Sequence, residues 1–152
     1  MPNLSDILPL LHFIGQNIAL FCGGLFSGAA IYVSLTECPP RSVLGQRELM
    51  LLTYAVGART NALLLGLSAV TAACALLAAY AGGGRFWLSG GLTQLAATAF
   101  LLTDVRSVTR RLEAMNPYEE QEAGGKLMQR RARQVAILAL VGLAAQYQFI
   151  LA

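Results

Sequence analysis

Residues 7–35 of the chain read ILPLLHFIGQNIALFCGGLFSGAAIYVSL and hold one histidine but no lysine, arginine, aspartate or glutamate. A helix needs roughly 20 mainly apolar residues to cross the hydrocarbon of a bilayer, and this stretch is longer than that. It also exceeds the apolar segment of a cleaved signal peptide, and no basic residue precedes it. We therefore expect it to be retained as a membrane-spanning helix.

Three further apolar runs follow, at residues 60–82, 86–103 and 135–152. The last two are short for a span, so we expect flanking residues to complete their ends. None of the runs shows the alternation of apolar and polar residues that is typical of strands. The sequence therefore predicts an all-α fold, in which residues 1–152 form one domain, an integral membrane bundle of four transmembrane helices.

The overall composition indicates the same class of protein. Of the 152 residues, 56% are hydrophobic and only 12% are charged, whereas a soluble domain carries about 25% charged residues. The net charge of +3 does not indicate nucleic-acid binding, because basic and aromatic residues are not interleaved on a polar surface. We expect the lipid bilayer as a partner, and no nucleic acid.

The cysteine and histidine content argues against a metal or cofactor site. Cys22, Cys38 and Cys74 include no C-x-x-C pair, and a cysteine inside an apolar run behaves as a small hydrophobe. Because His12 is the single histidine, a haem with two histidine ligands and a histidine-rich copper site are both excluded within this chain. We therefore expect no cofactor and no bound metal.

The basic residues are distributed unevenly between the predicted loops. The first and third loops hold ten of the eleven, namely Arg41, Arg47, Arg59, Arg106, Arg110, Arg111, Lys126, Arg130, Arg131 and Arg133. With four spans these two loops share one side, which the excess of basic residues marks as cytoplasmic. We therefore expect a multi-pass protein, of a bacterial inner membrane, with both termini outside the cytoplasm.

The third loop carries its own local signals. We expect the third helix to continue over residues 104–115 and to stop at Asn116-Pro117, since proline cannot continue a helix. Gly124-Gly125 predicts a flexible break, after which residues 126–134 begin the fourth helix. The basic run at residues 130–133 suits anionic lipids, although ordinary anchoring at the cytoplasmic side is the favoured reading.

Small residues recur at helical spacing in the first two spans. Gly24 and Gly28 form a G-x-x-x-G pair, and small residues at this spacing allow two helices to approach closely. The second span offers Ala62, Gly66, Ala69 and Ala73. We favour packing of these residues within the bundle over a dimer interface.

Four polar side chains within the predicted spans are candidates for a cluster in the interior of the bundle. His12 and Gln16 are one helical turn apart, and Gln94 and Gln146 lie near the middle of the third and fourth spans. Because an amide that faces lipid has no water to bond, these groups are expected to turn inward and meet. They either line a binding pocket or hold the helices together by hydrogen bonds, and we favour the second reading.

A second polar group lies at the predicted cytoplasmic rim, and its members are Glu37, Arg41, Arg59, Asn61, Asp104 and Arg106. Carboxylates and arginines at one depth can orient a polar substrate or move a proton. The favoured alternative is ion pairing and snorkelling at the lipid headgroups.

Two stretches resemble a known family. Residues 26–41, FSGAAIYVSLTECPPR, and residues 100–114, FLLTDVRSVTRRLEA, are similar to the first-helix signature and the third-helix end of the anthrone-oxygenase-like membrane family. The resemblance implies a four-span layout. It also implies oxidation of anthrones to anthraquinones with molecular oxygen and no cofactor. By the resemblance, four residues of this chain match positions of the family's motifs, namely Glu37, Pro39, Arg41 and Arg111.

The chain also departs from the family pattern. Cys38 stands where the family usually has histidine, residues 104–109 do not reproduce a Pro-Thr-Asn step, and residues 130–134 lack the usual tryptophan and histidine. These departures favour a non-catalytic accessory or structural subunit of a larger membrane complex. The alternative is a cofactor-independent oxygenase that acts on a hydrophobic aromatic substrate, and a small transporter is weaker because broken helices and intramembrane charges are missing.

The candidate site residues follow from both lines of reasoning. The catalytic candidates are His12, Gln16, Glu37 and Asp104. The candidates for substrate binding are Gln16, Gln94, Gln146, Arg59 and Arg111.

Overall fold

The computed structural model describes residues 4–37, 58–114 and 121–151, and every one of these positions is helical. The four long helices are α1 (Leu4–Tyr32), α4 (Ala58–Ala78), α5 (Gly84–Ala114) and α6 (Gln121–Leu151). Short π-helical turns, η1 (Val33–Glu37) and η3 (Ala79–Gly83), extend α1 and α4. The predictions of an all-α fold and of four helices are confirmed.

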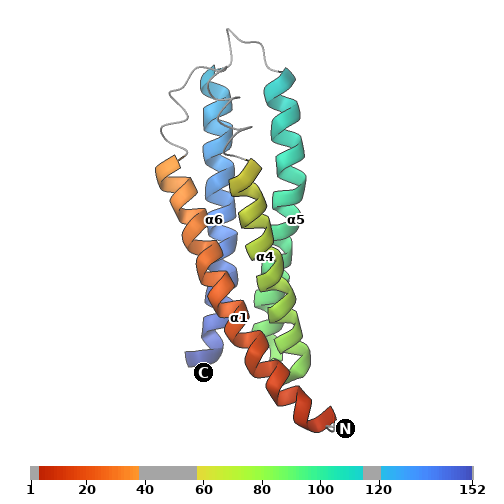
Figure 1. Cartoon of the computed structure of the whole chain (residues 1–152). Helices are drawn as coiled ribbons and strands as arrows, with labels where there is room; N and C mark the ends of the chain where they lie inside the picture. The colour runs from red at the N-terminus through yellow and green to blue at the C-terminus, as the bar shows by residue number, and fades with distance from the viewer. Residues whose placement is uncertain (1–3, 38–57, 115–120, 152) are drawn as a thin grey trace.

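The helices form an up-and-down bundle (Figure 1). Each helix packs against two neighbours, since α1 and α5 both contact α4 and α6. The N- and C-termini lie at one end of the bundle, and the end of α5 and the start of α6 lie at the other. This arrangement is the one that four successive crossings with both termini on one side require.

The turn between α4 and α5 depends on glycine. Gly82 has φ 110° and Gly84 has φ 71°, a region of backbone conformation that residues with a Cβ rarely adopt. No other described residue has a positive φ. This turn joins the apolar runs predicted at residues 60–82 and 86–103, and its glycines allow α4 and α5 to pack as an antiparallel pair.

The two predictions for the third loop had different outcomes. The third helix does continue past the apolar run, because α5 ends at Ala114. The predicted break at Gly124-Gly125 is wrong, since α6 begins at Gln121 and runs through both glycines. Each glycine costs a helix only about 1 kcal/mol relative to alanine, whereas a break would require a second helix nucleus.

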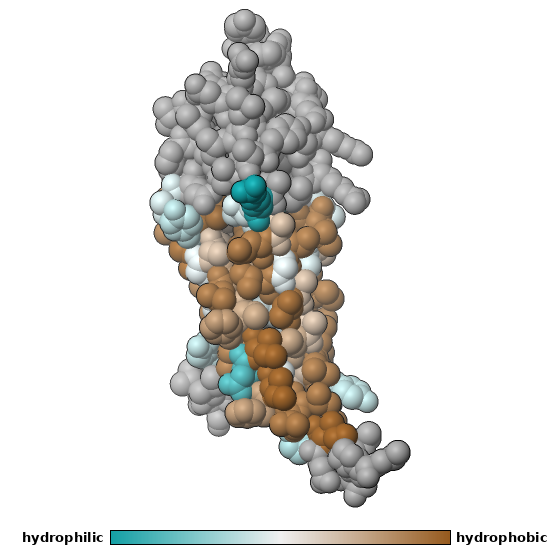
Figure 2. All heavy atoms as spheres, viewed as in Figure 1, coloured by the Kyte–Doolittle hydropathy of each residue, from teal (hydrophilic) through white to brown (hydrophobic). Residues whose placement is uncertain are grey.

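The bundle buries small side chains and exposes large ones. Most buried apolar residues are alanines, among them Ala19, Ala75 and Ala139, whereas Phe13 and Phe21 are 65% and 69% exposed. Figure 2 shows the result on one face, a continuous belt of hydrophobic residues around the middle of the molecule. A helix bundle that folds in water would place its large apolar side chains inside.

Three of the described helical stretches are long and apolar enough to cross a membrane, namely Ile7–Thr36, Arg59–Gly82 and Gly84–Thr103. The fourth helix is not among them. The side chains of α6 are described over residues 129–147, and this stretch begins with Arg130, Arg131 and Arg133.

Candidate functional site

A series of buried polar side chains runs along the interior of the bundle. These residues are less than 10% exposed, and they are Ser27, Ser34, Ser68, Thr71, Gln94, Thr98 and Gln146. Each of the four helices contributes at least one of them. The interior is thus a mixture of alanines and polar groups, and its chemistry depends on how those groups are hydrogen-bonded.

His12 and Gln16 form a hydrogen-bonded pair near the end of the bundle that holds the termini. The Nε2 of Gln16 lies 2.6 Å from the Nε2 of His12, and the Nδ1 of His12 lies 3.0 Å from the carbonyl oxygen of Ala78 in α4. Because a carbonyl only accepts, Nδ1 is the nitrogen that donates, and Nε2 accepts from the Gln16 amide. Both ring nitrogens of His12 therefore bond within the protein.

The backbones of α1 and α4 approach closely beside this pair. A Cβ added at Gly15 would lie 3.1 Å from the Cys74 carbonyl oxygen and 3.5 Å from the Ala78 Cβ. The hydrogen bond from His12 to Ala78 thus joins two helices that are already in contact, which is the arrangement expected of a structural hydrogen bond.

Gln94 and Gln146 occupy a second polar region, between α5 and α6. Both side chains are fully buried. A Cβ added at Gly90 of α5 would lie 2.6 Å from the Cγ of Gln146, and one added at Gly142 of α6 would lie 2.8 Å from the Nε2 of Gln94. Each glutamine therefore rests on the glycine of the opposite helix.

This reciprocal contact has a sequence signal that we did not use. Gly90 and Gln94 of α5 are four residues apart, and so are Gly142 and Gln146 of α6, which holds a further G-x-x-x-Q at Gly125 and Gln129. In an antiparallel helix pair, two such motifs place each glutamine opposite the partner's glycine. The repeat identifies the contact only when the two helices are known to be neighbours and the depth of each motif along the bundle is known.

The structure thus brings His12, Gln16, Gln94 and Gln146 together as two pairs at different depths along the bundle. Gly23, whose added Cβ would lie 3.4 Å from the Oε1 of Gln146, is seven residues beyond Gln16, about 10 Å along α1. The buried cluster of Ala19, Ala75, Ala78 and Trp87 lies at the intermediate depth. Trp87 is fully buried, and it carries no signal in the sequence beyond being the single tryptophan.

Buried hydroxyl groups supply further contacts that sequence reasoning missed. Ser68 of α4 and Thr98 of α5 are hydrogen-bonded at 2.9 Å. The Ser27 hydroxyl of α1 donates to the Ala139 carbonyl of α6 at 3.2 Å. Serine and threonine are frequent in the chain, so only a partner across the helix interface distinguishes these positions.

The rim candidates are only partly placed. Arg59 is exposed at the start of α4, and Asn61, two residues later, is half-buried. Glu37 ends η1, and Asp104, Arg106 and Arg111 lie on α5, but their side chains are outside the described residues. Arg41, with Cys38 and Pro39, falls in the segment of residues 38–57 that is also outside them.

The fold and the interior define a class of protein, a four-helix bundle with an apolar exterior and a polar centre. Comparisons of the chain with protein-family models, with curated proteins and with solved structures found no match.

Proposed function

We propose that the chain is an integral membrane protein in which all four helices cross the bilayer. The support is the distribution of side chains, with large apolar residues outside and alanine and polar residues inside. The fourth helix shares this pattern, since Ile137 and Val141 are 60% and 53% exposed while Gln146 and Ala139 are fully buried. Exposed apolar patches of this extent are otherwise rare on soluble proteins.

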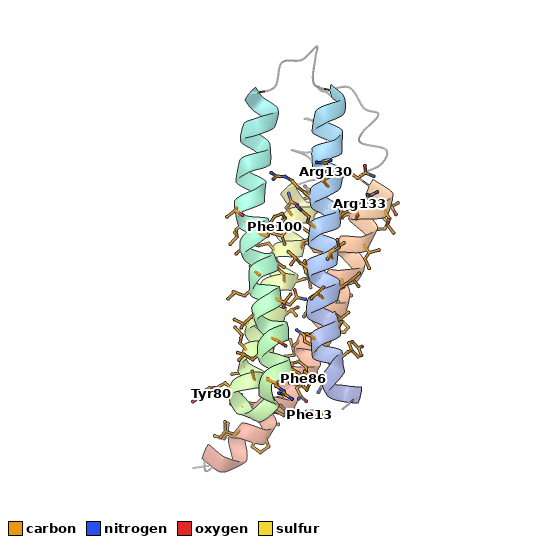
Figure 3. The ribbon with its side chains drawn as sticks, turned by 180° about the vertical axis from the view of Figure 1, so that it is seen from behind. Phe13, Tyr80, Phe86, Phe100, Arg130 and Arg133 are labelled. Atoms are coloured by element: carbon orange, nitrogen blue, oxygen red, sulfur yellow. The ribbon has the colours of Figure 1, made fainter. Side chains whose placement is uncertain are left out.

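The two ends of the bundle differ in a way that supports an orientation. Arg130 and Arg133 lie towards one end, with Phe100 nearby, and Phe13, Tyr80 and Phe86 lie at the other end (Figure 3). Arginines concentrate on the cytoplasmic side, and aromatic side chains sit at membrane interfaces. We place the end with the arginines in the cytoplasm of a bacterial cell, against anionic lipids, and both termini outside.

A reporter that is active only in the cytoplasm, fused to Ala152, tests the orientation and the fourth span together. The expected result is no signal. A strong signal would mean either that the orientation is reversed or that α6 does not cross the membrane, and a second fusion at Pro117 separates these two errors.

The function that we propose is that of a non-catalytic accessory subunit, which packs through its small-residue face against another membrane protein. One observation carries the proposal. Gly24 and Gly28 are exposed on α1, and no described atom lies within 4 Å of a Cβ built at either position. The prediction that they pack within the bundle is therefore wrong, and the G-x-x-x-G pair offers an outward surface that a foreign helix can approach closely.

Extraction of the chain from its native membrane in a mild detergent tests this function. We expect a stoichiometric partner with the wild-type chain and loss of that partner in Gly28→Leu. The control is Ala96→Leu, a change at an exposed small residue of α5, which does not pack on α1. A wild-type chain that is extracted alone, or a partner that survives Gly28→Leu, would contradict the subunit function.

The second candidate is a cofactor-independent oxygenase that acts on a hydrophobic aromatic substrate. Two features favour it: the resemblance of residues 26–41 and 100–114 to the anthrone-oxygenase-like family, and the half-buried His12 beside Gln16. A base at His12 would need an acceptor nitrogen, and Gln16 occupies that nitrogen. Substrate would therefore have to displace the Gln16 amide.

A further inference from the structure

The amides of Gln94 and Gln146 have unused hydrogen-bonding capacity. Neither Oε1 nor Nε2 of Gln146 has a hydrogen-bond partner within the described part of the chain, and the same holds for Oε1 of Gln94. The Nε2 of Gln94 makes one long contact, 3.5 Å to the Ala139 carbonyl oxygen. Burying a polar group without a partner is costly, and two adjacent examples point to a group that the protein itself does not supply.

All four helices surround these amides. Gln146 and Gly142 come from α6, Gln94 and Gly90 from α5, Gly23 from α1 and Thr71 from α4, and we call these six residues the amide layer. The Cβ positions of the three glycines would lie within 2.6–3.4 Å of the two glutamine side chains. Three of the four helices therefore present bare backbone to the amides.

The neighbouring hydroxyl groups do not satisfy them. The Thr71 hydroxyl donates to the Leu67 carbonyl at 2.7 Å. The Thr98 hydroxyl donates to the Gln94 backbone carbonyl at 2.8 Å and is paired with Ser68. Because the hydroxyl hydrogens are already donated, none is available to the Oε1 of either glutamine, and no hydroxyl oxygen accepts from the Nε2 of Gln146.

Apolar clusters flank the amide layer on both sides along the bundle axis, and on the arginine side the buried hydroxyls of Ser27, Ser68 and Thr98 lie beside the apolar residues. Towards the termini lies the cluster of Ala19, Ala75, Ala78 and Trp87. Towards the arginine end lies a larger cluster of Phe26, Ala30, Leu64, Ala97, Leu101, Val135, Ala136 and Ala139. A partner for the amides is therefore small, and it is uncharged because no residue of the amide layer is ionisable.

We infer that the amide layer is a binding site for ordered water, held by Gln146 and by the Oε1 of Gln94. Water is the smallest molecule that both donates and accepts, and buried waters typically make about three hydrogen bonds to groups that otherwise lack partners. The unpaired atoms here are two acceptors and one amide donor, which matches that capacity. The site is independent of the outward glycines on which the proposed function rests.

Magnetic resonance of the full chain in lipid nanodiscs, labelled with 15N at the glutamine side chains, tests the site directly. The Nε2 protons of Gln146, identified from their loss in Gln146→Met, are expected to cross-relax with water. Cross-relaxation of these protons only with the Gln94 side chain, or with lipid, would overturn the inference.

The sign of a stability change gives a second test that does not depend on spectral assignment. If water bridges the amides, Gln146→Met removes one of the two side chains that hold the water, and the Oε1 of Gln94 loses its hydrogen-bond partner. The Tm in detergent should then fall. If the amides are unpaired, methionine relieves the cost of burial and the Tm should rise, which would overturn the inference. The matched control is Gln134→Met, the same change at an exposed position of α6, for which no shift is expected.

Discussion

Glycine occupies two contrasting settings in this bundle. Gly24 and Gly28 face outward, and a Cβ built there meets no described atom within 4 Å, whereas Gly90 and Gly142 face inward against Gln146 and Gln94. In the sequence Gly24 and Gly28 are four residues apart in one helix, whereas Gly90 and Gly142 lie in different helices and each precedes a glutamine by four residues. The comparison shows that spacing identifies a face on which a helix can be approached closely, but that only the rotation of the helix decides what approaches it.

On α1, buried and exposed small residues are one position apart in the sequence. Gly23 and Ser27 are buried, whereas Gly24 and Gly28, each one position later, are exposed. One residue rotates the direction of a side chain by about 100°, which is sufficient to move a residue from the core to the exterior of the bundle.

The largest loss of stability is expected when a side chain is added at Gly90, which faces the interior of the bundle. An added Cβ would lie 2.6 Å from the Gln146 Cγ and 3.2 Å from the Gly142 carbonyl oxygen, and neither atom is the free end of a flexible side chain. We expect Gly90→Ala to destabilise the bundle by about 1–3 kcal/mol, in the range of core overpacking. Thermal unfolding in detergent measures this effect.

Gly66→Ala is the matched control for Gly90→Ala. Gly66 is exposed on α4, and nothing described lies within 4 Å of its added Cβ, so the same change should raise stability by up to about 1 kcal/mol through helix propensity. Equal effects of the two changes would remove the distinction between inward and outward glycines.

A smaller loss of stability is expected at Gly142, the other glycine of the reciprocal contact. The Cβ of Gly142→Ala would lie 2.8 Å from the Nε2 of Gln94, an atom at the end of a side chain that can rotate away. We expect a cost near 1 kcal/mol, below that of Gly90→Ala. Thermal unfolding of the two single variants tests the order, and the reverse order would mean that Gln94 is held more rigidly than Gln146.

The His12–Gln16 pair extends the comparison to polar groups. In His12→Gln, glutamine can replace one of the two hydrogen bonds, so we expect a loss of around 1 kcal/mol, the typical worth of one such bond between membrane helices. Any activity of the wild-type chain should be largely preserved.

An assay with an anthrone-type substrate separates the two candidate functions at the same position. Glutamine cannot take a proton, so an oxygenase with His12 as its base would lose turnover by a factor on the order of 10² or more. Such a loss in a variant that remains folded would replace the subunit function by the enzymatic one.

The sequence predicts helices better than it predicts their faces. Run length and the absence of charge suffice to locate the helices, and Gly82 and Gly84 suffice for the turn between α4 and α5. The break at Gly124-Gly125 was wrong because a local penalty of a few kcal/mol is outweighed by the continuity of α6, a helix of 31 residues. The pairing of Gln94 with Gly142 requires knowledge of which helices are adjacent, and no periodicity within one helix contains that.

The smallest effect is expected at Gly28, and it is the most sensitive test of the comparison. A leucine in place of Gly28 adds four carbon atoms, yet the structure has open space where the first of them would lie. Helix propensity favours leucine over glycine, and in a membrane the new side chain is as apolar as the lipid it meets. We therefore expect the Tm of the isolated chain in Gly28→Leu to equal or slightly exceed that of the wild type. Thermal unfolding after removal of any partner measures this, with Gly90→Leu as the inward counterpart that should unfold at a much lower temperature. A clear loss of stability in the isolated Gly28→Leu chain would place Gly28 at a helix contact within the bundle and would remove the surface on which the subunit function rests.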